Sequence, residues 1–176
     1  MRPVAAADWS RIAALEAEVY GPVSLSEGRD ALESRGRASP ETCFVLEAGD
    51  RIAGYVLSLP YPPSRYPDLT RAEDKPFGSR NLHLHDLVVA EELRGRGLGG
   101  RLLRHLTAAA ASRSYDRISL VSVGGTASFW AGHGYRPEPG VAPPVGYGEG
   151  AVYMYCPLPG RTSGGPPPGS RSDEEY

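Results

Sequence analysis

Two histidines stand two positions apart in the run LHLHDLVV, residues 82–89. If this run is a strand, His83 and His85 project from the same face, because alternate side chains of a strand point the same way. Imidazole titrates near neutral pH, so the pair could remove a proton from a reacting group. By simple alternation Asp86 points to the opposite face, unless a β-bulge redirects it, and it is a candidate for binding a substrate amine or orienting a histidine.

A metal site is the rival interpretation of the two histidines. Zinc needs a third protein ligand, which His105 or His133 could supply only through a tertiary contact that the spacing does not reveal. Cys43 and Cys156 belong to no CxxC pair, so they are interpreted as reduced packing residues. We therefore expect no metal.

A basic, glycine-rich segment, RGRGLGG at residues 94–100, separates the histidine run from an apolar helical pattern. Between a strand and a helix, its backbone amides and the helix N-terminus would face one point, which suits an anion such as a phosphate. Glycines let the anion approach the amides, and arginines add positive charge. The candidate contacts are Arg94, Gly95, Arg96, Gly97, Leu98, Gly99 and Gly100.

Two common phosphate-binding patterns fit this segment poorly. Gly95, Gly97 and Gly100 satisfy GxGxxG, but half the chain precedes them and they do not follow the strand directly, which weakens a dinucleotide-binding interpretation. Gly95 and Gly100 also have Walker A spacing, but Arg101 and Leu102 replace the Lys-Ser/Thr pair that contacts phosphate and magnesium. Nucleotide hydrolysis is therefore not expected.

A third pattern, Arg-x-x-Gly-x-Gly, is formed by Arg94, Gly97 and Gly99, and it resembles the acetyl-CoA signature of the GNAT acetyltransferases. In that family the loop binds the CoA pyrophosphate, and the preceding strand splays from its neighbour to hydrogen-bond the pantetheine arm. The later run SFWAGHGY, residues 128–135, looks like the family's second motif, which flanks the CoA thiol. The resemblance implies cofactor contacts at Leu87, Val88, Val89, Ser128 and Trp130.

The run LHLHDLVVAEELRGRGLGGRLLRHL is also similar to the arylalkylamine (serotonin) N-acetyltransferases, GNAT enzymes with paired histidines on this strand. The resemblance implies that His83 and His85 carry the proton away from the amine. Where the GNAT family commonly has a tyrosine that protonates the CoA thiolate, this sequence has Trp130, whose indole does not readily release a proton. The hydroxyls that could replace it are those of Tyr135, Tyr147, Tyr153 and Tyr155.

The elements that would position these residues follow from periodicity and turn signals. Helices are expected from Asp8 to the Gly21-Pro22 break, in a weaker segment after Ser26, and over residues 97–112 and 126–133. Gly49-Asp50 predicts a hairpin, and the strands are expected at residues 43–48, 51–59, 82–89, 118–123 and 151–158.

These elements make a mixed α/β domain with a sheet of about six or seven strands. The resemblance implies the GNAT fold, in which the sheet is mostly antiparallel and about four helices flank it. The proline-rich residues 60–81 are expected to form a long loop, which either contacts the substrate or is a surface excursion.

Composition limits the remaining possibilities. We expect one domain over residues 1–159 of the 176-residue chain and a disordered Gly/Pro/Ser-rich tail over residues 160–176. A net charge of -2 argues against nucleic acid as a partner, and no apolar run could span a membrane. Without a signal peptide, a cytoplasmic monomer or homodimer is expected.

The function expected from these observations is transfer of an acetyl group from acetyl-CoA to a small primary amine, possibly an arylalkylamine. The amine would attack directly in a ternary complex, because neither cysteine lies in a nucleophile motif. The alternatives are a noncatalytic acyl-CoA-binding sensor on the same fold, and acetylation of a protein or aminoglycoside amine.

Overall fold

The computed structural model describes residues 1–73, 77–142 and 144–159 of the chain. The tail expected over residues 160–176 lies outside the described residues, and its disorder stays a prediction, as does the boundary of the domain at residue 159. Within the described part, none of the helices combines the length and the apolar character that crossing a bilayer requires.

The sheet has seven strands in the order β1-β2-β3-β4-β5-β7-β6. Every neighbouring pair is antiparallel except β4 and β5, which run parallel. The predicted mixed α/β fold with a mostly antiparallel sheet is therefore confirmed. The strands are β1 (Arg2–Pro3), β2 (Phe44–Ala48), β3 (Arg51–Pro60), β4 (Asn81–Val89), β5 (Arg117–Ser122), β6 (Arg136–Pro137) and β7 (Val152–Pro157).

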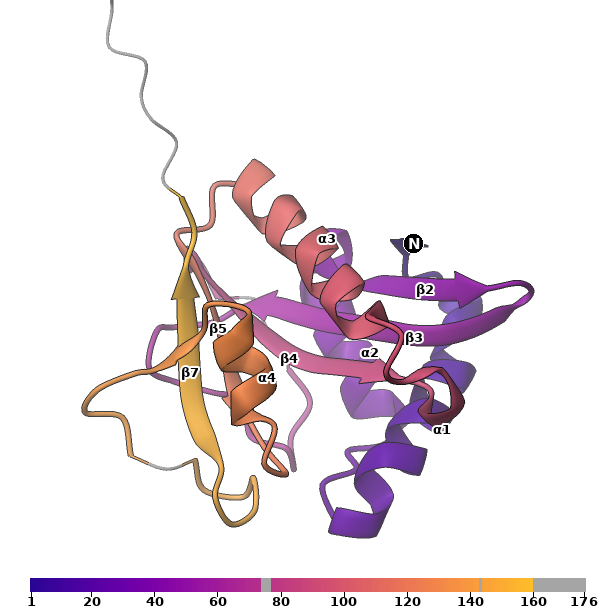
Figure 1. Ribbon diagram of the computed structural model, residues 1–176, viewed down its shortest axis with the longest axis horizontal. Helices are drawn as coiled ribbons and strands as arrows, with labels where there is room; N and C mark the ends of the chain where they lie inside the picture. The colour runs from indigo at the N-terminus through magenta and orange to yellow at the C-terminus, as the bar shows by residue number, and fades with distance from the viewer. Residues whose placement is uncertain (74–76, 143, 160–176) are drawn as a thin grey trace, which may run out of the picture.

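Helices cover both faces of this sheet (Figure 1). On one face, Ile12 and Leu32 of the first two helices share a buried core with β3. On the other face, Leu102 and Trp130 of the last two helices share a second core with β4 and β5. The helices are α1 (Trp9–Tyr20), α2 (Arg29–Ala38), α3 (Leu98–Ser112) and α4 (Ala127–Gly132), with 3-10 turns at Ala6–Asp8, Gly21–Val23, Pro40–Thr42 and Glu91–Leu93.

The helices and strands predicted from the sequence are present, with ends that differ by a few residues. The strands β1 and β6 were not expected, because two residues give no periodicity. Asp8 precedes α1, as a helix-capping residue would, but its side chain does not cap the helix. Its carboxylate accepts hydrogen bonds from the amide of Ala5 at 2.7 Å and from the Arg2 guanidinium instead.

A β-bulge interrupts β4 at His85. Leu57 of β3 pairs with Asp86, but the next residue, Ser58, pairs with Leu84, so His85 is an extra residue without a partner across the strand pair. A bulge reverses the side to which the following side chains point. The alternation expected from the sequence therefore ends at this residue.

The two hydrophobic cores show that the β4 side chains change sides at the bulge. Leu82 and Leu84, before the bulge, lie in the core under α3 and α4, and Leu87, after it, packs against the same core. Val88 lies instead in the core under α1 and α2. Asp86 consequently faces α1 and α2, on the same side as His83, which corrects the expectation from simple alternation.

The parallel strands β4 and β5 diverge after the bulge. Their pairing ends at Leu84 and Leu120, whereas β4 continues to pair with β3 as far as Val89. The edge of β4 that faces β5 therefore has no strand partner along its second half. Divergence of this kind opens a cleft in the middle of the sheet, between the carboxyl ends of two parallel strands.

Candidate active site

The divergence of β4 and β5 opens into a cleft of about 600 Å³. Its walls come from the second half of β4, the end of β5, the α1–α2 connection and the residues before α4. Seven of the predicted site residues line it: His85, Asp86, Leu87, Val88, Val89, Arg94 and Trp130. The cleft thus brings the histidine run, part of the glycine loop and the second motif to one place.

The glycine loop begins at Arg94, which lines the cleft, and ends at the N-terminus of α3. Gly95 and Gly97 have φ angles of +74° and +72°, a left-handed conformation that a side chain would strain. The first amide to bond within the helix is that of Arg101, to the carbonyl of Gly97 at 3.1 Å. The amides of Leu98, Gly99 and Gly100 precede this bond, and Gly97 provides no side-chain cap, so they are available to an anion.

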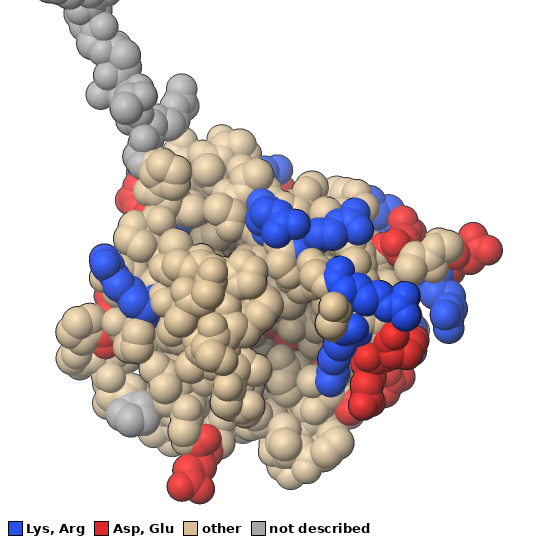
Figure 2. Space-filling model, in the orientation of Figure 1, with Lys and Arg blue, Asp and Glu red and all other residues tan. Residues whose placement is uncertain are grey.

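Positive charge surrounds this helix terminus. Figure 2 shows Arg side chains gathered over the first part of α3 and the loop before it, with acidic side chains beside them. Arg94 connects the loop to the cleft, since its Nε donates to the carbonyl of Val89 at 3.2 Å. The arrangement suits the pyrophosphate of a nucleotide-like cofactor whose remaining part extends along β4.

His83 does not reach the cleft. Its side chain is 1% exposed, its ring stacks on Tyr153, and Nδ1 lies 3.1 Å from the hydroxyl of Ser119. Burial, with the nearby charges of His85 and Arg35, lowers the pKa of His83 well below the ordinary value of 6.5. His83 is therefore a neutral, packed imidazole in this structure.

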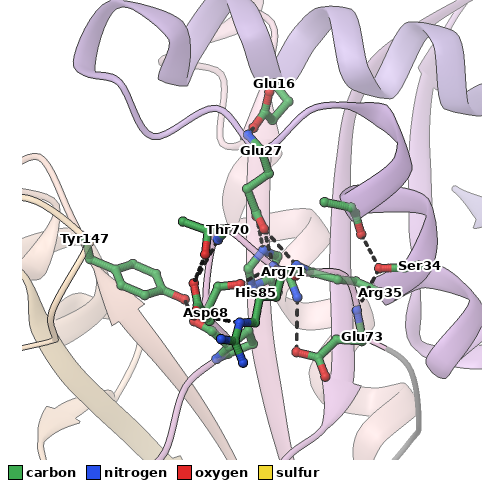
Figure 3. Close-up of polar contacts among 12 residues, drawn as sticks. Glu16, Glu27, Ser34, Arg35, Asp68, Thr70, Arg71, Glu73, His85 and Tyr147 are labelled. Atoms are coloured by element: carbon green, nitrogen blue, oxygen red, sulfur yellow. Dashed lines mark hydrogen bonds and ion pairs between the residues drawn. The ribbon is translucent and has the colours of Figure 1, made fainter.

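His85 lines the cleft, and a buried ion-pair network holds it (Figure 3). Its Nε2 hydrogen-bonds to Oε1 of Glu27, while Oε2 of Glu27 accepts from the Arg35 guanidinium, with Nε at 3.0 Å. Arg35 is fully buried and also donates to Glu73 at 3.1 Å. Glu27 in turn is fixed through its own amide, which donates to the carboxylate of Glu16 at 2.6 Å.

This network determines which nitrogen of His85 is free. Burial alone would raise the pKa of Glu27, but His85 and Arg35 outweigh it and the pKa is lowered, so Glu27 is a carboxylate that only accepts hydrogen bonds. Nε2 therefore carries a proton whichever charge the ring has, and Nδ1 is an acceptor in the neutral form of the ring. Nδ1 is buried and has no hydrogen-bond partner among the described residues.

Asp86 lies beside His85 in the cleft. Its Oδ2 accepts a hydrogen bond from the hydroxyl of Tyr55, and the hydroxyl of Tyr20 also bonds to this carboxylate. Oδ1 is buried and has no partner in the part of the chain that the structure describes. Burial raises the pKa of Asp86 to about 6, against the opposing effects of Tyr55, His85 and Tyr20.

Two other predicted site residues lie away from the cleft. Tyr135 is buried beside Trp130, at 5.7 Å between ring centroids, and does not line the cleft. Ser128 is exposed on α4. Trp130 belongs to the core and its Nε1 donates to Thr126 at 3.2 Å, so it serves as both a packing residue and a wall of the cleft.

The tyrosines that do line the cleft are Tyr20 and Tyr147. The hydroxyl of Tyr147 donates to the carbonyl of Pro67 at 2.7 Å, which joins the β6–β7 connection to the loop between β3 and β4. Of the tyrosines considered from the sequence as proton donors, Tyr147 is the one that lines the cleft. Tyr153 and Tyr155 are absent from its lining among the described residues.

The structure gives no support to a metal site. No group of three or more His, Cys, Asp or Glu side chains that could hold a metal occurs in the described residues. His105 packs edge-on against Phe44, and His133 packs against Phe129, so neither approaches the cleft histidine.

Sequence reasoning missed Glu27, Arg35, Tyr20 and Tyr55, which hold His85 and Asp86. All four come from other elements, and their contacts depend on how α1 and α2 pack on the sheet. The available signal was weak: an acidic residue just before a predicted helix is ordinarily explained by the helix dipole.

Comparison with known proteins agrees with this geometry. The sequence model of the Acetyltransferase (GNAT) family matches residues 9–135. None of the curated proteins compared with the chain matches it.

Several solved structures share the fold. The GphF GNAT-like decarboxylase in complex with isobutyryl-CoA superimposes with a TM-score of 0.74 at 23% identity, over 90% of this chain and 98% of its own. The loading GNATL domain of CurA from Lyngbya majuscula gives 0.74 at 19% identity, over 89% and 96%. N-acetylglutamate synthase from Neisseria gonorrhoeae, complexed with coenzyme A and N-acetyl-glutamate, gives 0.68 at 19% identity, over 89% of this chain and 34% of its own.

Proposed function

Because this chain belongs to the Acetyltransferase (GNAT) family, we propose that it transfers an acetyl group from acetyl-CoA to a small primary amine. The observation that carries the proposal is the buried Nδ1 of His85, which has no partner among the described residues and belongs to a side chain in the wall of a cleft that Arg94 of the glycine loop also lines. A base beside a cofactor-sized cleft is what attack by an amine on a thioester requires.

Acetyl-CoA would meet three parts of this region. The amides at the start of α3 and Arg94 would hold the pyrophosphate, and the unpaired edge of β4 would hydrogen-bond the pantetheine arm. A backbone amide in the region of Leu87 to Val89 would stabilise the oxyanion that forms during attack. The similar structures whose descriptions name isobutyryl-CoA and coenzyme A support this placement of the cofactor.

The proposed chemistry is a direct transfer. An alkylammonium gives one proton to Nδ1 of His85, and the nitrogen then forms a bond to the thioester carbon. The carbon–sulfur bond breaks as the carbonyl re-forms, and the CoA thiolate takes up one proton. Of the three protons on the ammonium nitrogen, one stays in the amide, one ends on the CoA sulfur and one reaches solvent.

Asp86 would hold the ammonium before transfer. Its free Oδ1 lies in the same wall as His85, so one carboxylate oxygen is available to a cationic group. Trp130 in place of the family's tyrosine fits a thiolate that leaves unaided or recovers the proton from the His85 imidazolium. The apolar walls Leu25, Val121 and Val123 favour an amine with an apolar body, of which an arylalkylamine is one example.

Calorimetry with CoA and acetyl-CoA, followed by measurement of thiol release across a panel of amines, tests the proposal. We expect binding of both thiol compounds and amine-dependent release of CoA, with the acetylated amine identified by mass spectrometry. Binding without turnover of any amine would favour a sensor. Release of carbon dioxide from malonyl-CoA would favour the decarboxylation that the description of one similar structure names. Failure to bind CoA would refute the assignment.

A further inference from the structure

A second, smaller cavity of about 40 Å³ continues the cleft towards α1. Three carboxylates, those of Glu16, Glu27 and Asp86, lie around it together with the imidazole of His85. We call this cavity the acceptor subsite, because His85 and Asp86 line both it and the larger cleft.

Two atoms of the acceptor subsite can accept a hydrogen bond from a ligand. Oδ1 of Asp86 and Nδ1 of His85 are the atoms of these side chains that have no partner among the described residues, and both are buried. Asp86 is 5% exposed, and the His85 side chain is 2% exposed. Buried acceptors without partners cost free energy, which a bound ammonium carrying several N–H donors would recover.

The positively charged guanidinium of Arg35 is already hydrogen-bonded to other groups of the protein. The Arg35 guanidinium uses Nε and Nη2 for Glu27, Nη1 for Glu73, and Nη2 again for the carbonyls of Asp68 and Arg71. Among the described residues that line the acceptor subsite, none is a lysine or an arginine. A carboxylate entering it would meet three acidic side chains and no available cation.

The walls of the acceptor subsite differ in character. Leu25, Val121, Val123 and Tyr147 line both this cavity and the larger cleft, whereas Glu16, Glu27 and Leu69 line this cavity without lining the cleft. The Tyr147 hydroxyl is held by the loop between β3 and β4, and the rings of Tyr66 and Tyr147 pack edge to face. The end of the acceptor subsite away from the cleft is therefore acidic, which disfavours a carboxylate on the acceptor.

We propose that the acceptor subsite selects amines that carry no carboxylate, and that it rejects amino acids. The selectivity rests on the proposed function, because it describes the acceptor of that reaction. It arises from the carboxylates of Glu16, Glu27 and Asp86, which repel a carboxylate on the acceptor.

Matched acceptor pairs assayed on the full chain with acetyl-CoA test the selectivity. Phenethylamine against phenylalanine, and tryptamine against tryptophan, differ by the carboxylate alone. We expect kcat/KM to be on the order of 100-fold higher for each carboxylate-free amine, since like charges brought together in a buried site cost several kcal/mol.

The outcomes separate the two proposals. Equal or greater turnover of phenylalanine or of tryptophan would overturn the selectivity while leaving the acetyltransferase function intact. No CoA release with any amine would overturn the function itself.

The variant Asp86→Asn tests the origin of the selectivity. It should raise KM for phenethylamine about 10-fold and reduce the difference in kcat/KM between phenethylamine and phenylalanine. The affinity for CoA should stay unchanged. Asp50→Asn, in the exposed β2–β3 turn, is the matched control and should leave both unchanged. An unchanged difference in kcat/KM between the two amines in folded Asp86→Asn protein would contradict the role of Asp86. If that variant does not fold, the acceptor pairs assayed on the wild-type protein still test the selectivity.

Discussion

Nε2 of His85 donates its hydrogen to a carboxylate oxygen of Glu27, a residue 58 positions earlier in the chain. The bond joins the segment before α2 to the bulge of β4, and the buried Arg35 holds the second oxygen of the same carboxylate. The tautomer of the imidazole is thereby fixed by a residue that belongs to neither of the sequence motifs.

Replacement of Glu27 by Gln should impair turnover while sparing cofactor binding. The amide can present its NH2 to His85 and so favour the other tautomer, which would place the proton on Nδ1. We expect kcat to fall on the order of 10²-fold with an unchanged affinity for CoA. Steady-state kinetics and calorimetry measure the two quantities. Glu33→Gln, a surface change within α2 where Glu33 pairs with Arg37, is the control, and an equal effect of both changes would contradict the role of Glu27.

The two histidines should respond differently to substitution. His85→Ala removes the base and should lower kcat by about 10²- to 10⁴-fold. His83→Phe keeps an aromatic ring against Tyr153 and removes a contact to Ser119, which Asn81 also bonds. That change should lower the melting temperature and leave kcat within about threefold, because the ring does not reach the cleft. Comparable losses of kcat would mean that His83 takes part in proton transfer.

Gly97→Ala should weaken CoA binding. Its φ of +72° costs an alanine about 1 kcal/mol, and relaxation of that strain would turn the first amides of α3 away from the pyrophosphate. Gly49→Ala is the matched control, since Gly49 has a φ of +60° in the β2–β3 turn, away from the cleft. Both variants should lose similar stability by thermal denaturation, and the loss of CoA affinity should be confined to Gly97→Ala.

Asp86 should make stability depend on pH. Its pKa is raised from 3.8 to about 6, so between these values the folded protein keeps a proton that the unfolded chain loses, and the free energy of unfolding falls as pH rises. The groups that face Asp86 are Tyr20 of α1, Tyr55 of β3, His85 and Glu27. The difference between 3.8 and about 6 corresponds to about 3 kcal/mol.

Asp86→Asn removes this titration. Denaturant unfolding from pH 4 to pH 7 should therefore show the variant gaining stability relative to the wild type as pH rises. A constant difference between the two proteins across this range would show that the Asp86 carboxyl titrates as it does in the unfolded chain.

Local patterns predicted the parts of the site that depend on local backbone. The strand containing His85 and the glycine loop before α3 follow from periodicity and from residues that tolerate positive φ, and both are in the structure. The same patterns predict the divergence of β4 and β5 only through resemblance to GNAT enzymes, because nothing in either strand alone limits its pairing.

The β4 bulge and the partners of His85 could not be found in this way. The extra residue at His85 is defined by the register with β3, and Glu27 reaches it because α1 and α2 pack on that face. Alternation alone treats the two histidines as equivalent. Packing makes one a neutral core residue and places the other at the cleft.

The parting of β4 from β5 leaves an open row of main-chain donors and acceptors inside the molecule instead of at its rim. A ligand with amide groups of its own can form hydrogen bonds with these unpaired main-chain groups of β4. The hydrogen bonding of the sheet is therefore complete only when such a ligand is present. Stability then becomes a function of metabolite concentration: a cell rich in acyl thioesters would hold this protein folded more firmly than a starved one.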